Sequence, residues 1–173
     1  MFKNFTLKQK LIFLSITPIL LALFFAFTLI KQTYERSYNA HKTNELLSLA
    51  ILNSNLVHEL QKERGLTAGY IGSNGSPEFK EKLSKQRKLT DTLKAKKMAM
   101  YKEYPEFFEN IYLAQAKTNN TNLLSQLEGM REKVNNKQIT LKKAMAYYTT
   151  MNASLLHVIE AVSYTHLTLP TKA

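Results

Sequence analysis

The feature that most constrains the fold is the segment LIFLSITPILLALFFAFTLI, Leu11 to Ile30, which contains no charged residue. As a helix rising about 1.5 Å per residue, it would span the roughly 30 Å hydrocarbon layer of a membrane. It is too long for a typical signal-peptide core, and the stretch AFTLIKQTYE at its end offers no small-residue cleavage site. A buried core helix is seldom this long without a charge. The segment therefore predicts an uncleaved membrane helix over 11–30.

The chain is strongly basic, with a formal net charge of +11. Such a balance suits nucleic acid, anionic lipid or a small anion. The basic residues are spread along the chain rather than clustered with aromatic residues, so we predict no nucleic-acid partner. Positive residues flank the apolar segment on both sides, so the positive-inside rule does not decide its orientation. They are Lys3, Lys8 and Lys10 before it and Lys31, Arg36 and Lys42 after it.

The composition favours long helices over a turn-rich β fold, because the 173 residues include only 5 glycines and 4 prolines. A hydrophobic share of 45% allows one modest domain with its own core. There is no cysteine, which excludes disulfides and thiolate chemistry. The 4 histidines lack zinc-ligand spacing, so we expect neither a metal site nor a cofactor.

Helical periodicity follows the apolar segment. Apolar and small side chains recur at steps of three and four over residues 46–71, as on one face of a helix. No proline interrupts between Pro18 and Pro77, so we expect one helix from the membrane segment to near the end of that range. The sequence GSNG, residues 72–75, predicts its end, and Ser76 before Pro77 predicts a new, serine-capped helix.

Two more helices are predicted further along the chain. Tyr104-Pro105-Glu106 repeats the restart signal, and the element that follows is interrupted by TNN, residues 118–120, before it resumes and ends at Asn135-Asn136. An apolar stripe from Ala144 to Val158 predicts the last helix. Four helices with short connections predict an all-α fold, in which the membrane helix continues into an antiparallel four-helix-type bundle that is truncated.

The helical pattern stops at Ala161. From Val162 the sequence VSYTHLTLPTKA is threonine-rich and β-leaning, and residues 162–171 look like the translation of a sequencing-library adapter. We interpret 162–173 as a non-native tail and expect the natural protein to continue past Ala161. The alternative is a natural tail.

Arg64 is the first candidate binding residue. It lies four residues from Leu60, on the apolar face of its helix, whereas Glu63 points about 100° away and would be a poor partner. A buried guanidinium needs an anionic partner, and a planar anion suits its two-point geometry. Gly65 and Gly69 each cost roughly 1 kcal/mol inside a helix, which favours a close approach of a ligand or another helix. The alternative is an arginine at the edge of the stripe, reaching water or pairing with a carboxylate of another helix.

Arg131 and Arg87 are the other candidates for an anion site. Each follows a leucine by four residues, Arg131 on the apolar face and Arg87 beside it. Structural ion pairs are the alternative use of both. Evidence for catalysis is poor, because Glu59 and Glu63 have no nucleophile or metal ligand nearby in the sequence, and we predict no enzyme in this segment.

The stretch LVHELQKERGLTAGYIGSNG, followed by FKEKLSKQRKLTD, resembles the start of the NIT domain, the nitrate- and nitrite-sensing domain of bacterial receptors. LEGMREKVNN and AMAYYTTMNASLLHVI are similar to later parts of its first half, so the resemblance covers roughly 46–159. It implies that nitrate or nitrite binds through arginines, including Arg64 in the ERG motif. The carry-over to Arg131 and Arg87 is left open.

The resemblance also implies a domain order and a location. We expect a short cytoplasmic tail over 1–10, the membrane helix over 11–30 and an extracytoplasmic sensor region over 31–161, in the inner membrane of a bacterium. Receptors of this kind usually form homodimers. Their output module is typically a methyl-accepting chemotaxis region, a histidine kinase or a cyclic-nucleotide enzyme.

Two alternatives stay open. One is a helical chemoreceptor-type domain that senses another small anion or a partner protein. The other is a membrane-anchored structural or adaptor bundle that binds a partner helix and does not respond to ions.

Overall fold

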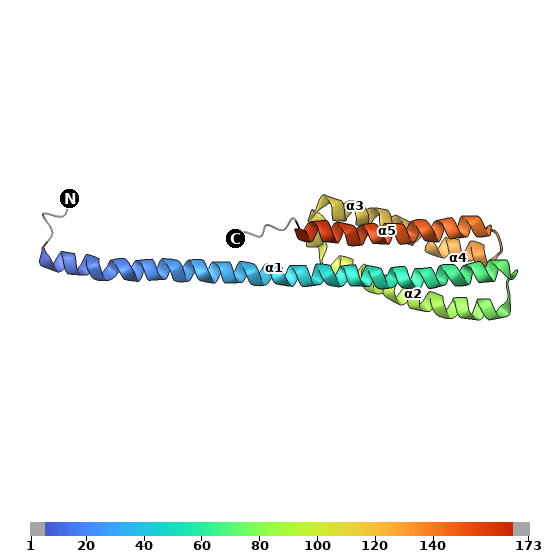
Figure 1. The fold of residues 1–173 in the computed structure, drawn as a ribbon, viewed down its shortest axis with the longest axis horizontal. Helices are drawn as coiled ribbons and strands as arrows, with labels where there is room; N and C mark the ends of the chain where they lie inside the picture. The colour runs from blue at the N-terminus through green and yellow to red at the C-terminus, as the bar shows by residue number, and fades with distance from the viewer. Residues whose placement is uncertain (1–5, 168–173) are drawn as a thin grey trace. The chain divides into compact units, whose positions relative to one another are not determined.

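The computed structural model describes residues 6–167, with side chains as far as Tyr164, and confirms the predicted all-α class (Figure 1). The elements are α1 (Leu7–Gly72), α2 (Pro77–Glu103), the 3-10 helix η1 (Pro105–Glu109), α3 (Ile111–Ser125), α4 (Leu127–Asn135) and α5 (Leu141–Leu167). The chain divides into two compact units, Met1–Asn44 and Glu45–Ala173. The predicted single helix from the apolar segment to the GSNG turn is therefore α1.

The first unit contains the amino-terminal part of α1. Its large apolar side chains over 11–30 are exposed, and the most apolar window has a mean hydropathy of 2.4 with 0% of its residues buried. Pro18 lies inside the helix, where the hydroxyls of Ser15 and Thr17 donate to the Leu11 and Phe13 carbonyls at 3.0 and 2.7 Å. By length and composition, this part of α1 is a candidate membrane span.

The second unit is a helical bundle whose buried apolar side chains form three clusters. The first cluster includes Leu46, Leu49, Tyr101, Phe107, Leu113 and Val158. The central cluster includes Leu56, Leu60, Leu124, Leu127, Met151 and Leu155, and the last includes Tyr70, Leu83, Val134 and Ala144. Along α1, the residues that join the first, central and last clusters follow one another in that order. Along α5 the order is reversed, from Ala144 in the last cluster to Val158 in the first, so the two helices are antiparallel. The predicted stripe from Ala144 to Val158 is buried as expected.

Two polar layers separate the apolar clusters. Between the first and central clusters lie Lys97, Asn120 and Ser154, from α2, α3 and α5, all buried. Between the central and last clusters lie Glu63 of α1 and Arg131 of α4, which are 0% and 2% exposed. Because buried polar groups are costly unless they are paired, these layers are the places where the fold departs most from a plain apolar core.

The turn between α1 and α2 agrees with its sequence. Asn74 and Gly75 adopt positive φ values of 55° and 92°, and the Gly75 amide donates to the Tyr70 carbonyl at 2.8 Å. Ser76 occupies the predicted cap position, but its side chain makes no capping hydrogen bond. The start of α2 is thus favoured by Pro77 at the first helical position. The capping hydrogen bond that we expected from the Ser76 hydroxyl is not formed.

Two predicted boundaries are wrong. The expected interruption at residues 118–120 does not occur, because α3 continues to Ser125 and the break comes at Gln126. Asn120 stays inside the helix with its amide bonded across the bundle: it accepts from Lys97 Nζ and donates to Ser154 Oγ, the latter at 2.7 Å. The β-leaning stretch from Val162 is helical as far as Leu167, and Val162 is 5% exposed in the first cluster.

Candidate functional site

A buried ion pair between Glu63 and Arg131 forms the centre of the candidate site. Arg131 Nε donates to Glu63 Oε1 at 2.8 Å, and Arg131 Nη2 donates to Oε2 at 2.9 Å. The carboxylate is 0% exposed, and the arginine side chain is 3% exposed. This two-point geometry is the strongest arrangement available to a guanidinium and a planar oxyanion. In Arg131, the Nε–Nη2 edge is thus already filled by a carboxylate of the protein itself.

Three further groups complete the bonding of this pair. Tyr148 Oη donates to Glu63 Oε1 at 2.9 Å, while Arg131 Nη1 donates to Asp91 at 2.7 Å and to Glu128 at 3.3 Å. Burial lowers the pKa of Arg131, but the hydrogen bonds and charges of Glu63 and Asp91 outweigh it, so the net shift is upward. Burial, reinforced by the negative charge of Glu63, raises the pKa of Tyr148. Tyr148 is therefore a neutral donor and Arg131 a fixed cation.

Arg64 does not occupy the buried position that the periodicity predicted. The structure places Glu63 there, and Arg64 is only half-buried. The buried positions of α1 beyond Asn53 are Leu56, Val57, Leu60, Glu63, Thr67 and Tyr70, and apart from Val57 they follow one another at steps of three and four residues. The prediction therefore placed the buried face one residue too far along the helix. Arg64 lies at the edge of the buried face, which is the alternative given from the sequence.

Arg87 is the guanidinium that is left without full bonding. Its Nη1 donates to Asn135 Oδ1 of α4 at 2.9 Å. Its Nε and Nη2 are shielded from solvent and have no hydrogen-bond partner among the residues that the structure describes. The nearest acid is Glu63, whose Oε1 lies 3.8 Å from Arg87 Nε, too far for a hydrogen bond. Burial accordingly lowers the pKa of Arg87.

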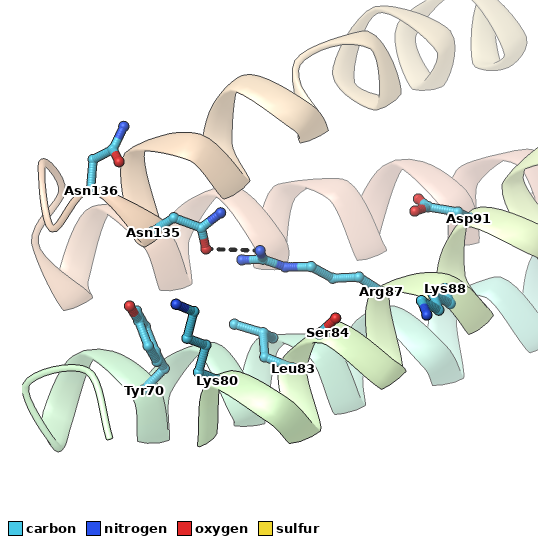
Figure 2. A pocket seen from close by; sticks show the side chains of 9 residues that line it. All are labelled: Tyr70, Lys80, Leu83, Ser84, Arg87, Lys88, Asp91, Asn135 and Asn136. Carbon is cyan, nitrogen blue, oxygen red and sulfur yellow. Dashed lines mark hydrogen bonds between the residues drawn. The ribbon is translucent and has the colours of Figure 1, made fainter. Parts of the chain in front are cut away.

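A pocket of about 470 Å³ adjoins Arg87. Figure 2 shows the Arg87 side chain extended from α2 toward Asn135, with Tyr70 and Lys80 on the opposite side of the space. The lining residues are Tyr70, Lys80, Leu83, Ser84, Arg87, Lys88, Asp91, Asn135 and Asn136. Three cations and one carboxylate line the pocket, so it favours an anion, which could also accept bonds from the asparagine amides.

The structure brings two of the three predicted site residues together. Arg87 and Arg131 approach the same carboxylate from α2 and α4, with Nε–Oε1 distances of 3.8 and 2.8 Å to Glu63. Arg64 makes no hydrogen bond or ion pair with any residue within 6–167. The geometry favours the alternative use of Arg131, a structural ion pair, because its three nitrogens all have carboxylate partners.

Sequence reasoning missed the two residues that organise these arginines. Glu63 looks like a poor partner for its neighbour Arg64, and Tyr148 falls within the stripe from Ala144 to Val158 that predicts core packing. A signal for Glu63 existed in the spacing to Leu60 and Thr67, which places it on the buried face. Nothing in the sequence pairs it with Arg131, which is 68 positions away.

Fold and site together define an all-α bundle with a half-buried guanidinium beside a basic pocket. The family model described as nitrate and nitrite sensing matches residues 55–169, well over half of the chain. The chain belongs to this NIT family, a family of sensing domains, as the sequence resemblance predicted. No curated protein and no solved structure matches the chain significantly.

Proposed function

We propose that this chain is the sensory part of a bacterial transmembrane receptor that binds nitrate or nitrite beside Arg87. One observation carries the proposal: two N–H groups of the half-buried Arg87 guanidinium have no acceptor among the described residues, and the same arginine lines an anion-favouring pocket. A buried donor without a partner costs about 1–3 kcal/mol, more when it is charged. A planar oxyanion would supply the missing acceptors in two-point geometry, as Glu63 does for Arg131.

In this proposal, the three arginines have different roles. Arg87 would contact the anion, and Arg131 would hold Glu63 in place. Arg64 stays a second candidate contact, on the family resemblance and because its half-buried guanidinium is unpaired among the described residues. No catalytic step is proposed for any of them.

Signalling requires that the anion prefer one arrangement of the helices over another. α1 contains both the candidate membrane span and Glu63. We propose that the bundle is extracytoplasmic and that a shift of α1 on binding passes the signal across the inner membrane, in a homodimer, to a cytoplasmic output module. The continuity of α1 supports this route.

The size of the pocket favours a second candidate function. Its volume of about 470 Å³ is far larger than a four-atom anion requires. A domain of the same fold that senses a larger oxyanion would use the same three cations. A thermal-shift screen of anions separates the two possibilities, because a specific ligand raises the melting temperature of the protein that it binds.

Nitrate titration of the full chain in detergent tests the proposal, at constant ionic strength with chloride as the replacement ion. We expect a nitrate-specific rise in melting temperature that Arg87→Gln abolishes. Arg36→Gln removes the same charge from an exposed position of α1 and should retain the response. An undiminished response in Arg87→Gln would overturn the site, and Arg64→Ala tests the second contact in the same way.

A further inference from the structure

The Glu63 carboxylate lies where it can interact with either of two guanidinium groups. It bonds Arg131 at 2.8 and 2.9 Å and Tyr148 at 2.9 Å, and Arg87 Nε is 3.8 Å from its Oε1. Glu63 is thus held firmly from α4 and α5 and only loosely from α2. The loose contact involves Arg87, whose Nε and Nη2 are shielded from solvent and have no hydrogen-bond partner among the described residues.

The unfilled donors of Arg87 face inward in this arrangement. Nε and Nη2 are both shielded from solvent, whereas Nη1 is held at Asn135. Nε and Nη2 form one edge of the guanidinium, the edge with which Arg131 binds Glu63. An anion in the pocket therefore cannot reach this edge of Arg87 until the side chain turns away from Glu63.

Charge opposes simultaneous contact of Arg87 with both partners. An oxyanion on the Nε–Nη2 edge would lie next to the Glu63 carboxylate, and two like charges at this separation repel strongly in a partly desolvated site. Glu63 itself cannot move toward water without losing the bonds from Arg131 and Tyr148. The group that is free to change partner is Arg87.

We propose that Glu63 is the affinity-setting residue of the anion site, because its carboxylate competes with the bound anion for Arg87. This inference rests on the proposed function. In the empty site, Arg87 stays near Glu63 and is shielded. In the occupied site, Arg87 turns to the pocket, and its contact with α1 is exchanged for one with the anion. Binding of the anion to Arg87 of α2 would thus affect α1, because Glu63 of α1 would lose its contact with the Arg87 guanidinium.

The test compares the nitrate affinity of the full chain in detergent with that of three variants. Glu63→Gln removes the competing charge but keeps the side-chain length, and we expect it to bind nitrate roughly tenfold more tightly, within the usual range of coupling between sites. Glu63→Gln/Arg131→Met removes both charges of the buried pair, so that neither is left unpaired, and should also bind more tightly. Arg87→Gln should not bind. Circular dichroism of each variant checks that it folds.

The direction of the change distinguishes competition from a structural role, because damage to the site lowers affinity, whereas removal of a competitor raises it. Unchanged or weaker binding in the folded double variant, with binding still lost in Arg87→Gln, would overturn this inference alone. Absence of nitrate-specific binding in all four proteins would overturn the proposed function as well. Tighter binding in both Glu63 variants supports the competition.

Discussion

Glu63 of α1 and Arg131 of α4 are joined by two parallel hydrogen bonds of 2.8 and 2.9 Å in the interior of the bundle. The pair connects positions 68 residues apart, and Tyr148 of α5 adds a third bond to the same carboxylate. Helices α1, α4 and α5 therefore meet at one charged layer. Because a two-point bond has a defined geometry that an apolar stripe lacks, we expect this layer to restrict sliding of the helices past one another.

Removal of one partner of this pair should be costly. We expect Arg131→Met to lower the free energy of unfolding by about 3–5 kcal/mol, because it leaves the Glu63 carboxylate buried without its main counter-charge. Urea unfolding monitored by circular dichroism measures the change. Lys82→Met is the matched control, since Lys82 pairs with Glu78 on the surface and should cost less than about 1 kcal/mol. Equal losses in the two variants would contradict the buried pair.

The two adjacent tyrosines of α5 should differ in their contribution. Tyr148 Oη donates to a buried carboxylate at 2.9 Å, and Tyr147 Oη donates to the neutral Leu123 carbonyl at 2.8 Å. We expect Tyr148→Phe to cost about 1.5–3 kcal/mol and Tyr147→Phe about 0.5–1.5 kcal/mol, because bonds to charged groups are stronger. Urea unfolding of both variants gives the comparison. A smaller loss for Tyr148→Phe would show that its bond to Glu63 is not made in solution.

The sequence predicted most of the helices because their ends and apolar faces are local signals. The GSNG turn, proline at the start of α2 and the stripe of α5 all lie where periodicity and turn residues placed them. The break between α3 and α4 was predicted too early in the chain, because Asn120 looks like a turn residue by itself. Its role inside α3 depends on Lys97 and Ser154, which are 23 and 34 positions away.

The candidate site was predicted only in part for the same reason. The sequence identified the arginines, but their surroundings depend on which helix faces which. A phase difference of one residue on α1 exchanged Glu63 for Arg64, because a helix turns about 100° per residue. Arg87 looked marginal beside its stripe, and its unfilled donors exist only once α1 and α4 are packed around it.

The glycines of α1 offer a matched pair of substitutions. A Cβ at Gly69 would clash with the ring of Phe79, whereas a Cβ at Gly65 would have nothing within 4 Å. We expect Gly69→Ala to destabilise the bundle by about 1–3 kcal/mol through overpacking against α2. Gly65→Ala should stabilise it by about 0.5–1 kcal/mol, since alanine is the better helix former. Thermal unfolding of both variants measures the difference, and stabilisation by Gly69→Ala would show that Phe79 moves away freely.

The other polar layer should make stability depend on pH. Lys97 is 0% exposed, bonds Asn120, and takes part in no ion pair with any residue over 6–167. The titratable groups near it are a second lysine, Lys117, and the neutral Tyr101 hydroxyl. Lys97 Nζ lies 5.2 Å and Lys117 Nζ 5.3 Å from the Tyr101 ring centroid. Burial without a counter-charge lowers the pKa of Lys97 to about 7.

The sign follows from proton linkage. The unfolded lysine titrates near 10.5, so between about pH 7 and that value the unfolded chain binds more protons at this site than the folded one. Stability should therefore rise with pH across this window and stay flat below it. We expect the melting temperature of the full chain in detergent to increase from pH 7 to about 9, below the range in which most tyrosines ionise, and Lys97→Met to remove the slope. Lys96→Met, an exposed neighbour on α2, should retain it, and an equal slope in Lys97→Met would show that another group is responsible.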